Sequence, residues 1–322
     1  MKIIKPSFYK DFKCIAGACP DSCCQGWEVD ADSDSLAYYA SLDSSLDIKK
    51  KIDSVLDKDE FGNTIFSLAP KKRCPFLNSE NLCDMHIAIG AEHTPVTCRN
   101  FPRFTNNFGG TREMGVSFSC PVAADMMYAL DKWEFDEEVN GELPLLNDID
   151  PERFIFLKKR RREIIDILQN RALHIRERLI SVLELCNDLI PDSEAVTDCK
   201  TGFFDVFINP ELINPEWEEK VKNAKIKAVD NTVFNENIAM YFIYKYFLAS
   251  VLESDCDALC AVKMAAVGVL IATYIGSDAW TLHLWSKETE HSQYNMDRYL
   301  NLLKTSECLT VKNLIKLLKA EV

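Results

Sequence analysis

The stretch FKCIAGACPDSCCQGW, residues 12–27, contains four cysteines within eleven consecutive positions. Free thiols oxidise and capture stray metal ions, so a dense group of cysteines suggests that the sulfurs are used together. Four further cysteines follow before residue 121, and eight of the thirteen in the chain therefore lie in its first 120 residues. They are Cys14, Cys19, Cys23, Cys24, Cys74, Cys83, Cys98 and Cys120.

The cellular compartment bears on whether these thiols bind a metal or pair with each other. The first ten residues lack the apolar core of about 7–15 residues that a secretory signal carries. The longest apolar run, residues 264–274, is shorter than the ~20 residues needed to span a bilayer. We therefore expect a cytoplasmic protein without a membrane segment, in which thiols stay reduced. In that setting the pattern favours a metal or iron–sulfur site over disulfides.

Charge and composition limit the classes of partner. A net charge of −13 disfavours nucleic-acid binding, because an acidic surface repels phosphate backbones. It would suit a partner that presents lysines, although acidic surfaces more often serve solubility alone. The basic run at residues 158–162 predicts a solvated helix rather than a polyanion site, because five consecutive residues circle the helix axis.

Hydrophobic patterning divides the chain into three parts. Residues 1–130 form an irregular, cysteine-rich metal- or cluster-binding region, with a hairpin expected at Gly109-Gly110. Residues 131–150 are acidic and predict a linker or loop. Residues 151–322 show helical periodicity almost throughout and predict an all-α domain on which the first region packs. The predicted fold class is therefore mainly α.

Several helices stand out within this division. In the first part, only residues 33–56 have mostly helical spacing. In the last part, an amphipathic stripe runs over residues 151–190, with Asp150 as the expected N-cap. A second helix, rich in aromatic residues, covers 235–252. A third, over 257–275, is apolar nearly all round and predicts the central buried helix.

Four segments resemble the flagellin lysine-N-methylase family, within a broader group of bacterial cysteine-rich proteins thought to chelate zinc or iron. The pair Gly26-Trp27 and the helical C-terminal half favour the methylase branch of that group. The four segments are residues 12–27, Cys74-Pro75-Phe76-Leu77 with Leu82-Cys83, Thr97-Cys98-Arg99-Asn100-Phe101-Pro102-Arg103, and Ser119-Cys120-Pro121.

The resemblance implies methyl transfer from S-adenosylmethionine to surface lysines of flagellin, mediated by a [4Fe-4S] cluster. The residues themselves are equally compatible with a zinc site, because cysteine spacing alone does not separate zinc from iron–sulfur sites. They show neither the glycine-rich turn of a nucleotide-binding α/β fold nor the CxxxCxxC triplet of radical enzymes. The alternative is a non-catalytic zinc- or iron-chelating structural or interaction protein, and a redox or metal-trafficking protein is a third, weaker reading.

The sequence does not settle which four cysteines would bind a cluster. Two histidines in the same region, His86 and His93, could complete a mixed site, although a lone histidine is more often not a ligand. The densest motifs favour Cys19, Cys23, Cys24 and the group from Cys74 to Cys98.

A few other residues are candidates for handling a substrate. Arg99 and Arg103 could bind a carboxylate or neutralise a thiolate-bound site, and a structural ion pair is as good a reading. Tyr241 and Tyr244 could line a channel for lysine, although an aromatic stripe on a helix is usually core. His291 could act as the general base that deprotonates a lysine ammonium, since histidine titrates near pH 7.

Overall fold

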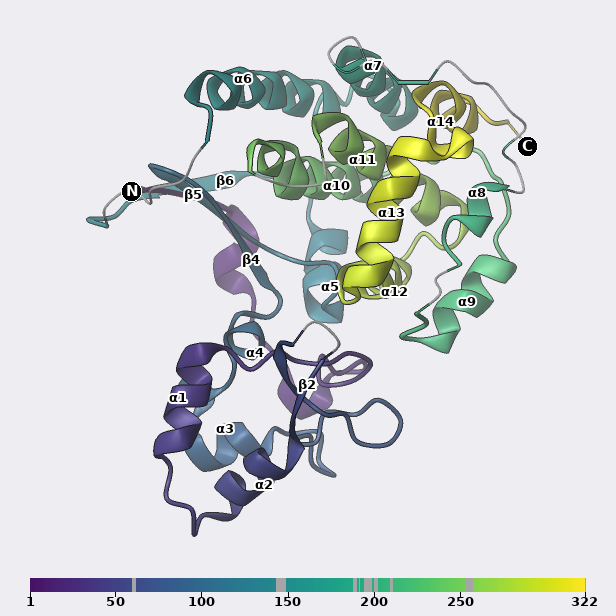
Figure 1. The fold of residues 1–322 in the computed structure, drawn as a ribbon. Coiled ribbons are helices and arrows are strands. Elements are labelled where there is room, and N and C mark those ends of the chain that lie inside the picture. Colours follow the sequence, from purple (N-terminus) through teal and green to yellow (C-terminus); the bar gives the residue numbers. More distant parts are fainter. Residues whose placement is uncertain are drawn as a thin grey trace. The chain divides into compact units, whose positions relative to one another are not determined.

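The computed structural model describes residues 1–59, 62–142, 149–187, 190, 192–193, 199, 202–208, 211–252 and 257–321 (Figure 1). The chain forms two compact units, and each is discontinuous in sequence. One, the helical unit, comprises Met1–Phe12, Thr105–Ser119 and Ala123–Val322. The other, the cysteine unit, comprises Lys13–Phe104 and Cys120–Val122. Residues 1–130, grouped together by their sequence pattern, thus contribute to both units.

The helical unit contains a four-stranded sheet with strand order β4-β5-β1-β6. Strand β1 (Lys2–Pro6) pairs in parallel with β5 (Thr111–Val116) and antiparallel with β6 (Phe135–Val139). Strand β4 (Arg103–Phe108) lies beside β5, and the two are joined at Gly109, whose φ of +60° is readily reached by glycine. The predicted hairpin is therefore confirmed.

Strand β6 corrects the prediction of a loop over residues 131–150. Its sequence FDEEV is acidic and largely exposed, which is unusual for a strand. The acidic side chains instead pair with lysines of the neighbouring strand β1: Lys2 Nζ lies 2.7 Å from Glu137 Oε2, and Lys5 Nζ lies 2.6 Å from Glu138 Oε1. Opposite charges across two strands stabilise their pairing.

Helices make up the rest of the helical unit, and no strand occurs among the described residues from 149 to 321. The mainly α fold class and the all-α C-terminal part are thus confirmed. None of the helices the structure describes is long and apolar enough to cross a bilayer. The helices are α5 (Pro121–Ala129), α6 (Pro151–Leu168), α7 (Ile175–Asn187), α8 (Gly202–Asp205), α9 (Pro215–Lys222), α10 (Val233–Phe242), α11 (Ala258–Tyr274), α12 (Ala279–Glu290), α13 (Gln293–Thr305) and α14 (Val311–Leu318).

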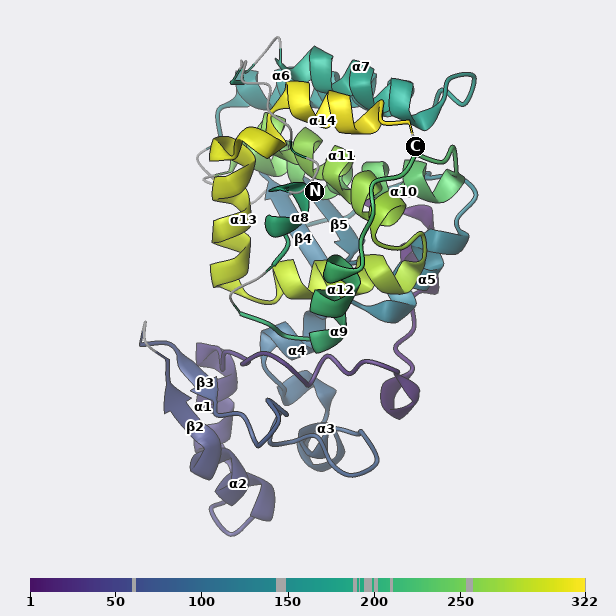
Figure 2. The ribbon, with the colours of Figure 1, turned by 90° about the vertical axis from the view of Figure 1, so that its right-hand side faces the viewer.

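Helix α11 is the centre of this unit, as its uniformly apolar sequence predicts. Every one of its residues is buried, and it packs against α7, α10, α12, α13 and α14. Figure 2 shows it flanked by α10 and α14. The four-residue spacing of Cys256 and Cys260 beside this apolar run predicts buried core cysteines. Cys260 is indeed buried on α11, and Cys256 lies outside the described residues.

The stretch predicted as one helix over residues 151–190 is two helices. Asp150 caps α6 as expected, accepting hydrogen bonds from the backbone N–H groups of Glu152 and Arg153. A corner follows at residues 169–174, where the buried carboxylate of Glu236 on α10 pairs with two arginines. Arg171 Nη2 lies 3.0 Å from Glu236 Oε1, and Arg178 Nη1 lies 2.7 Å from Glu236 Oε2.

The basic run at residues 158–162 is only partly solvated, which corrects the sequence-based expectation. Arg161 is buried and makes a bidentate ion pair with the buried Glu113 of β5, with Nη1 2.7 Å from Oε2. Its neighbour Arg160 lies nearer the surface and pairs with Glu163 on the same helix. One face of α6 therefore buries a charge that only a partner distant in sequence can neutralise.

The cysteine unit has little regular structure and a small core. Its helices are α1 (Ser33–Ser41), α2 (Asp47–Val55), α3 (Asp84–Ile89) and α4 (Val96–Asn100), and its strands are β2 (Leu56–Lys58) and β3 (Thr64–Phe66). The predicted helix over 33–56 is divided in two, because Asp43 Oδ1 accepts a hydrogen bond from Ser45 N and turns the chain between α1 and α2. The buried core consists of Val29, Ala31, Tyr39, Ile52, Phe66, Phe76 and Met85.

Candidate functional site

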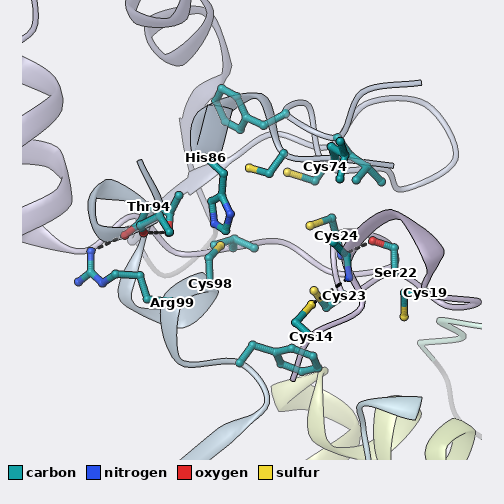
Figure 3. A pocket seen from close by; sticks show the side chains of 18 of the residues that line it. Cys14, Cys19, Ser22, Cys23, Cys24, Cys74, His86, Thr94, Cys98 and Arg99 are labelled. Carbon is teal, nitrogen blue, oxygen red and sulfur yellow. Dashed lines mark hydrogen bonds between the residues drawn. The ribbon is translucent and has the colours of Figure 1, made fainter. Parts of the chain in front are cut away.

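All eight cysteines of the N-terminal group line one pocket in the cysteine unit (Figure 3). The cavity has a volume of about 490 Å³, and its wall also includes Trp27, Phe66, Phe76 and His86. The dense grouping in the sequence predicts that these sulfurs act together, and the fold does bring them to one place. All eight N-terminal cysteines therefore line the same pocket.

The segment that contains Cys23 and Cys24 lies antiparallel to the segment that contains Cys74. Gly26, with φ of +100°, turns the chain after Cys24, and its N–H donates to the Lys72 carbonyl at 2.8 Å. The N–H of Cys74 in turn donates to the Cys24 carbonyl at 2.8 Å. These two backbone bonds place Cys24 beside Cys74, although fifty residues separate them in the chain.

The second segment folds back on itself around Asn78. Its side-chain oxygen accepts hydrogen bonds from the N–H groups of Glu80 and Leu82, which closes the turn. Leu77 then forms an isolated β-bridge with Cys83, and Cys83 is the N-cap of α3. The short turn thereby brings Cys74 and Cys83 to the same wall of the cavity, where both also pack against the core.

Three of the thiols contact one another directly. Cys23 and Cys74 both hydrogen-bond the sulfur of Cys24. The bond from Cys23, and then that from Cys74, lower the pKa of Cys24 to about 3 and outweigh the opposing effect of burial. The same bonds, followed by burial, raise the pKa of Cys23 and of Cys74. These bonds therefore favour the thiolate form of Cys24, the form of cysteine that binds metals and acts as a nucleophile.

The other cysteines are arranged around these three. Cys98 on α4 and His86 lie on one side of the cavity, and Cys23 and Cys24 lie on the other (Figure 3). Cys19, which the sequence places among the favoured ligands, donates its thiol hydrogen to the Asp21 carbonyl at 3.2 Å. Among the side chains that the structure describes, no group of three or more His, Cys, Asp or Glu is arranged to hold a single metal ion.

The two arginines proposed from the sequence both line the pocket. Arg99 donates from Nη1 to the Glu92 carbonyl at 3.0 Å and to the Thr94 carbonyl, and so fastens the loop before α4. Arg103 is exposed at the start of β4. His93, the second candidate histidine, stacks on Tyr38 with ring centroids 3.7 Å apart.

The remaining candidates belong to the helical unit. The Tyr244 hydroxyl lies 2.9 Å from the carbonyl oxygens of both Ile4 and Met114, which are main-chain atoms of the sheet. His291 follows α12, and burial, then the charge of Lys287, lower its pKa to about 3, which makes it a weak base at neutral pH. Tyr241 is buried, and its hydroxyl lies 3.2 Å from Glu290 Oε1.

The structure adds residues around Tyr241 that the sequence reasoning missed. Lys245, Ser117 and Ser286 join Tyr241 and Glu290 in one hydrogen-bonded group. The spacing of Tyr241 and Lys245, and that of Ser286 and Glu290, is four residues on a helix, which is a recognisable signal. Ser117 gives no such signal, because it reaches the group from the end of strand β5.

Comparisons with known proteins give a partial match. No protein-family model and no solved structure matches the chain. The chain is 28% identical over 122 residues to the "Flagellar biosynthetic protein FliU" of Salmonella muenchen, a match that covers 37% of this chain and 72% of that protein. It is also 28% identical over 122 residues to the "Lysine-N-methylase" of Salmonella choleraesuis (strain SC-B67) and of Salmonella typhimurium (strain LT2). Those matches cover 37% of this chain but only 30% of each methylase.

Proposed function

We propose that this protein N-methylates surface lysines of flagellin, with S-adenosylmethionine as the methyl donor and a [4Fe-4S] cluster held by the cysteine pocket. The observation that carries the proposal is the convergence of all eight N-terminal cysteines on one cavity. The names of the similar proteins, a lysine-N-methylase and a flagellar biosynthetic protein, support the reaction type and the acceptor. Two further features of the pocket support the cofactor.

The first feature is the chemistry of the donors. Iron–sulfur clusters are held by cysteine thiolates, which can come from distant segments of a chain. A cluster is larger than one ion, so its ligands surround a volume and do not need to converge on one point. That requirement agrees with a cavity of about 490 Å³ in which no single-ion site is formed by the described side chains.

The second feature is the set of thiols that contact or face Cys24. Cys23 and Cys74 are hydrogen-bonded to it, and Cys98 lies near enough to interact with its charge. We assign Cys23, Cys24, Cys74 and Cys98 as the ligands, with Cys83 as the nearest replacement. When bound, the cluster would supply iron–sulfur chemistry at the pocket. The protein's own part is to hold one sulfur as a thiolate and to line the rest of the cavity with Trp27 and other apolar side chains.

A non-catalytic metal protein is the second candidate, and the small core of the cysteine unit favours it. Among the described residues, seven buried hydrophobic side chains form that core, with partly buried ones packed against them. In small domains, the free energy of metal binding stabilises a fold that has too little apolar burial of its own. On this reading the pocket would hold zinc or iron for structural reasons, and the helical unit would bind a partner.

Cofactor analysis followed by a methyl-transfer assay separates the two. Anaerobically purified protein is expected to absorb broadly near ~400 nm, with iron and sulfide in matching amounts. Incubation with S-adenosylmethionine and flagellin should then add mass in steps of one methyl group to flagellin lysines, and heat-treated protein is the control. A colourless protein that contains zinc and leaves flagellin unmodified would contradict the methylase and support the structural reading.

A further inference from the structure

The ammonium group of Lys245 lies among three side chains of the helical unit, the carboxylate of Glu290 and the aromatic side chains of Tyr241 and Tyr246. Its Nζ lies 2.8 Å from Glu290 Oε1 and 3.1 Å from the hydroxyl of Tyr241. The same atom lies 5.5 Å from the ring centroid of Tyr241 and 5.1 Å from that of Tyr246. A cation within about 6 Å of an aromatic face is attracted to it. These three residues, Tyr241, Tyr246 and Glu290, are called the ammonium cage below.

The carboxylate of the cage also accepts hydrogen bonds from three hydroxyl groups. Ser117 and Ser286 donate hydrogen bonds to Glu290 Oε2 at 2.5 and 2.8 Å, and Tyr246 donates to Oε1 at 2.5 Å. Burial would raise the pKa of Glu290, but the charge of Lys245 and the hydrogen bonds lower it to about 2. Glu290 is therefore an ionised binding group rather than a proton acceptor at neutral pH.

The backbone that carries Lys245 departs from an α-helix at this point. Residues Ile243–Phe247 form a π-helical turn directly after α10, and Asn106 donates to the Lys245 carbonyl at 2.8 Å. In a continuous α-helix Tyr246 would point about 140° away from Tyr241. The wider π turn lets Lys245 and Tyr246 both reach Glu290. Such turns are rare and are found frequently at functional sites.

A second buried lysine shows what a purely internal ion pair looks like in this unit. Lys263 Nζ lies 2.7 Å from Asp192 Oδ2 and 2.7 Å from the Leu303 carbonyl, and its side chain is only 2% exposed. The Lys245 side chain is 15% exposed, so it is more open to solvent than Lys263, whereas the two carboxylates, Glu290 at 10% and Asp192 at 9%, are shielded alike. The two pairs thus differ in the exposure of the lysine.

We propose that the ammonium cage is a binding site for primary alkylammonium groups, in which Lys245 is the resident ligand. Glu290 and Tyr241 each accept an N–H, so a primary ammonium matches the cage better than a quaternary one does. A lysine side chain of another protein and a free alkylamine share this chemistry. The inference does not require the methylation proposed above.

The test empties the cage and supplies its ligand from solution. Lys245→Ala removes the resident ammonium together with Cγ, Cδ and Cε, and n-butylammonium supplies an alkylammonium that is one carbon longer than the lost fragment. Thermal unfolding is measured against the concentration of n-butylammonium at constant ionic strength, with n-butanol as the uncharged control. Lys263→Ala is the matched control for loss of a buried, paired lysine. Lys245→Ala combined with Glu290→Gln removes the charge of the cage while keeping its shape.

We expect n-butylammonium to raise the melting temperature of Lys245→Ala saturably, with no such effect of n-butanol. Affinity should fall by about tenfold or more in the double variant, because a hydrogen-bonded ionic contact is lost. Absence of saturable binding to folded Lys245→Ala would overturn the proposal. So would equal responses of Lys245→Ala, Lys263→Ala and the double variant.

Two further measurements complete the test. If Lys245→Ala does not fold alone, it is refolded in n-butylammonium chloride or in potassium chloride. Recovery only with the amine supports the site, and failure in both salts overturns it. Nα-acetyl-lysine N-methylamide then distinguishes the sources of the ligand: binding of both compounds indicates a protein lysine, and binding of n-butylammonium alone indicates a free amine.

Discussion

The two units of this chain solve the problem of stability in different ways. The helical unit surrounds α11, a helix with every residue buried, and it neutralises its buried charges in ion pairs such as Arg161–Glu113. Among its described residues, the cysteine unit has a core cluster of seven buried hydrophobic residues and eight thiols around a cavity. Hydrophobic burial accounts for the stability of the helical unit. For the cysteine unit, we propose that a metal or cluster bound by its sulfurs adds to a small core.

The largest expected effect concerns the thiolate at the centre of the pocket. Cys24→Ser should lower the bound iron or zinc by at least about tenfold, since Cys24 accepts hydrogen bonds from two neighbouring thiols and is the preferred ligand. Hydrogen-exchange mass spectrometry should show lost protection in the cysteine unit and unchanged protection in α11. Cys260→Ser, a core cysteine of α11, is the control and should keep the metal. Equal metal content in Cys24→Ser and Cys260→Ser would contradict the proposal that the cysteine unit binds the metal through Cys24.

The next largest effect tests how the helical unit handles buried charge. Arg161→Met leaves the carboxylate of Glu113 buried without its bidentate partner, which should cost about 3–5 kcal/mol in the free energy of unfolding. Arg160→Met, one residue earlier, breaks the ion pair with Glu163 nearer the surface and the cation–π contact with Phe156, and should cost about 1 kcal/mol. Urea unfolding followed by circular dichroism measures both. Similar losses in the two variants would show that the burial of Arg161 does not matter.

A smaller effect, which depends on pH, concerns the shielded carboxylate of Glu290 in the helical unit. The pKa of Glu290 is lowered to about 2 in the folded protein, so its contribution to stability is complete above its usual pKa near 4.5 and is lost as the pH falls towards 2. The wild type should lose up to about 3 kcal/mol relative to Glu290→Gln over that interval. Urea unfolding at a series of pH values gives the difference. A difference that is constant with pH would mean that Glu290 is not stabilised as a carboxylate.

The smallest expected effect concerns the acidic strand β6. Lys5→Met removes the exposed ion pair with Glu138 and should cost about 0.2–1 kcal/mol, an effect that diminishes at high salt. Thermal unfolding at low and high ionic strength measures it, with Lys13→Met of the cysteine unit as the control. A larger, salt-independent loss would indicate that Lys5 acts through packing instead of charge.

Local pattern predicted much of the helical unit. The uniformly apolar run of α11 and the Asp150–Pro151 start of α6 were readable because helix burial and capping depend on residues a few positions apart. The corner between α6 and α7 was not, because it depends on Glu236 of α10. Strand β6 was missed for the same reason, because Glu138 pairs with Lys5, which lies 133 residues earlier in the chain.

By itself the sequence determined the helical class of the C-terminal part and the concentration of eight thiols in the first 120 residues. Both follow from composition and short-range spacing. Only the tertiary structure decided that Cys24 meets Cys74 and that Lys245 meets Glu290. The first contact depends on two backbone bonds between remote segments, and the second on a π-helical turn facing the end of α12. Contacts of this kind form only when segments remote in sequence fold together, because burying a charged or polar group costs free energy unless a partner compensates it.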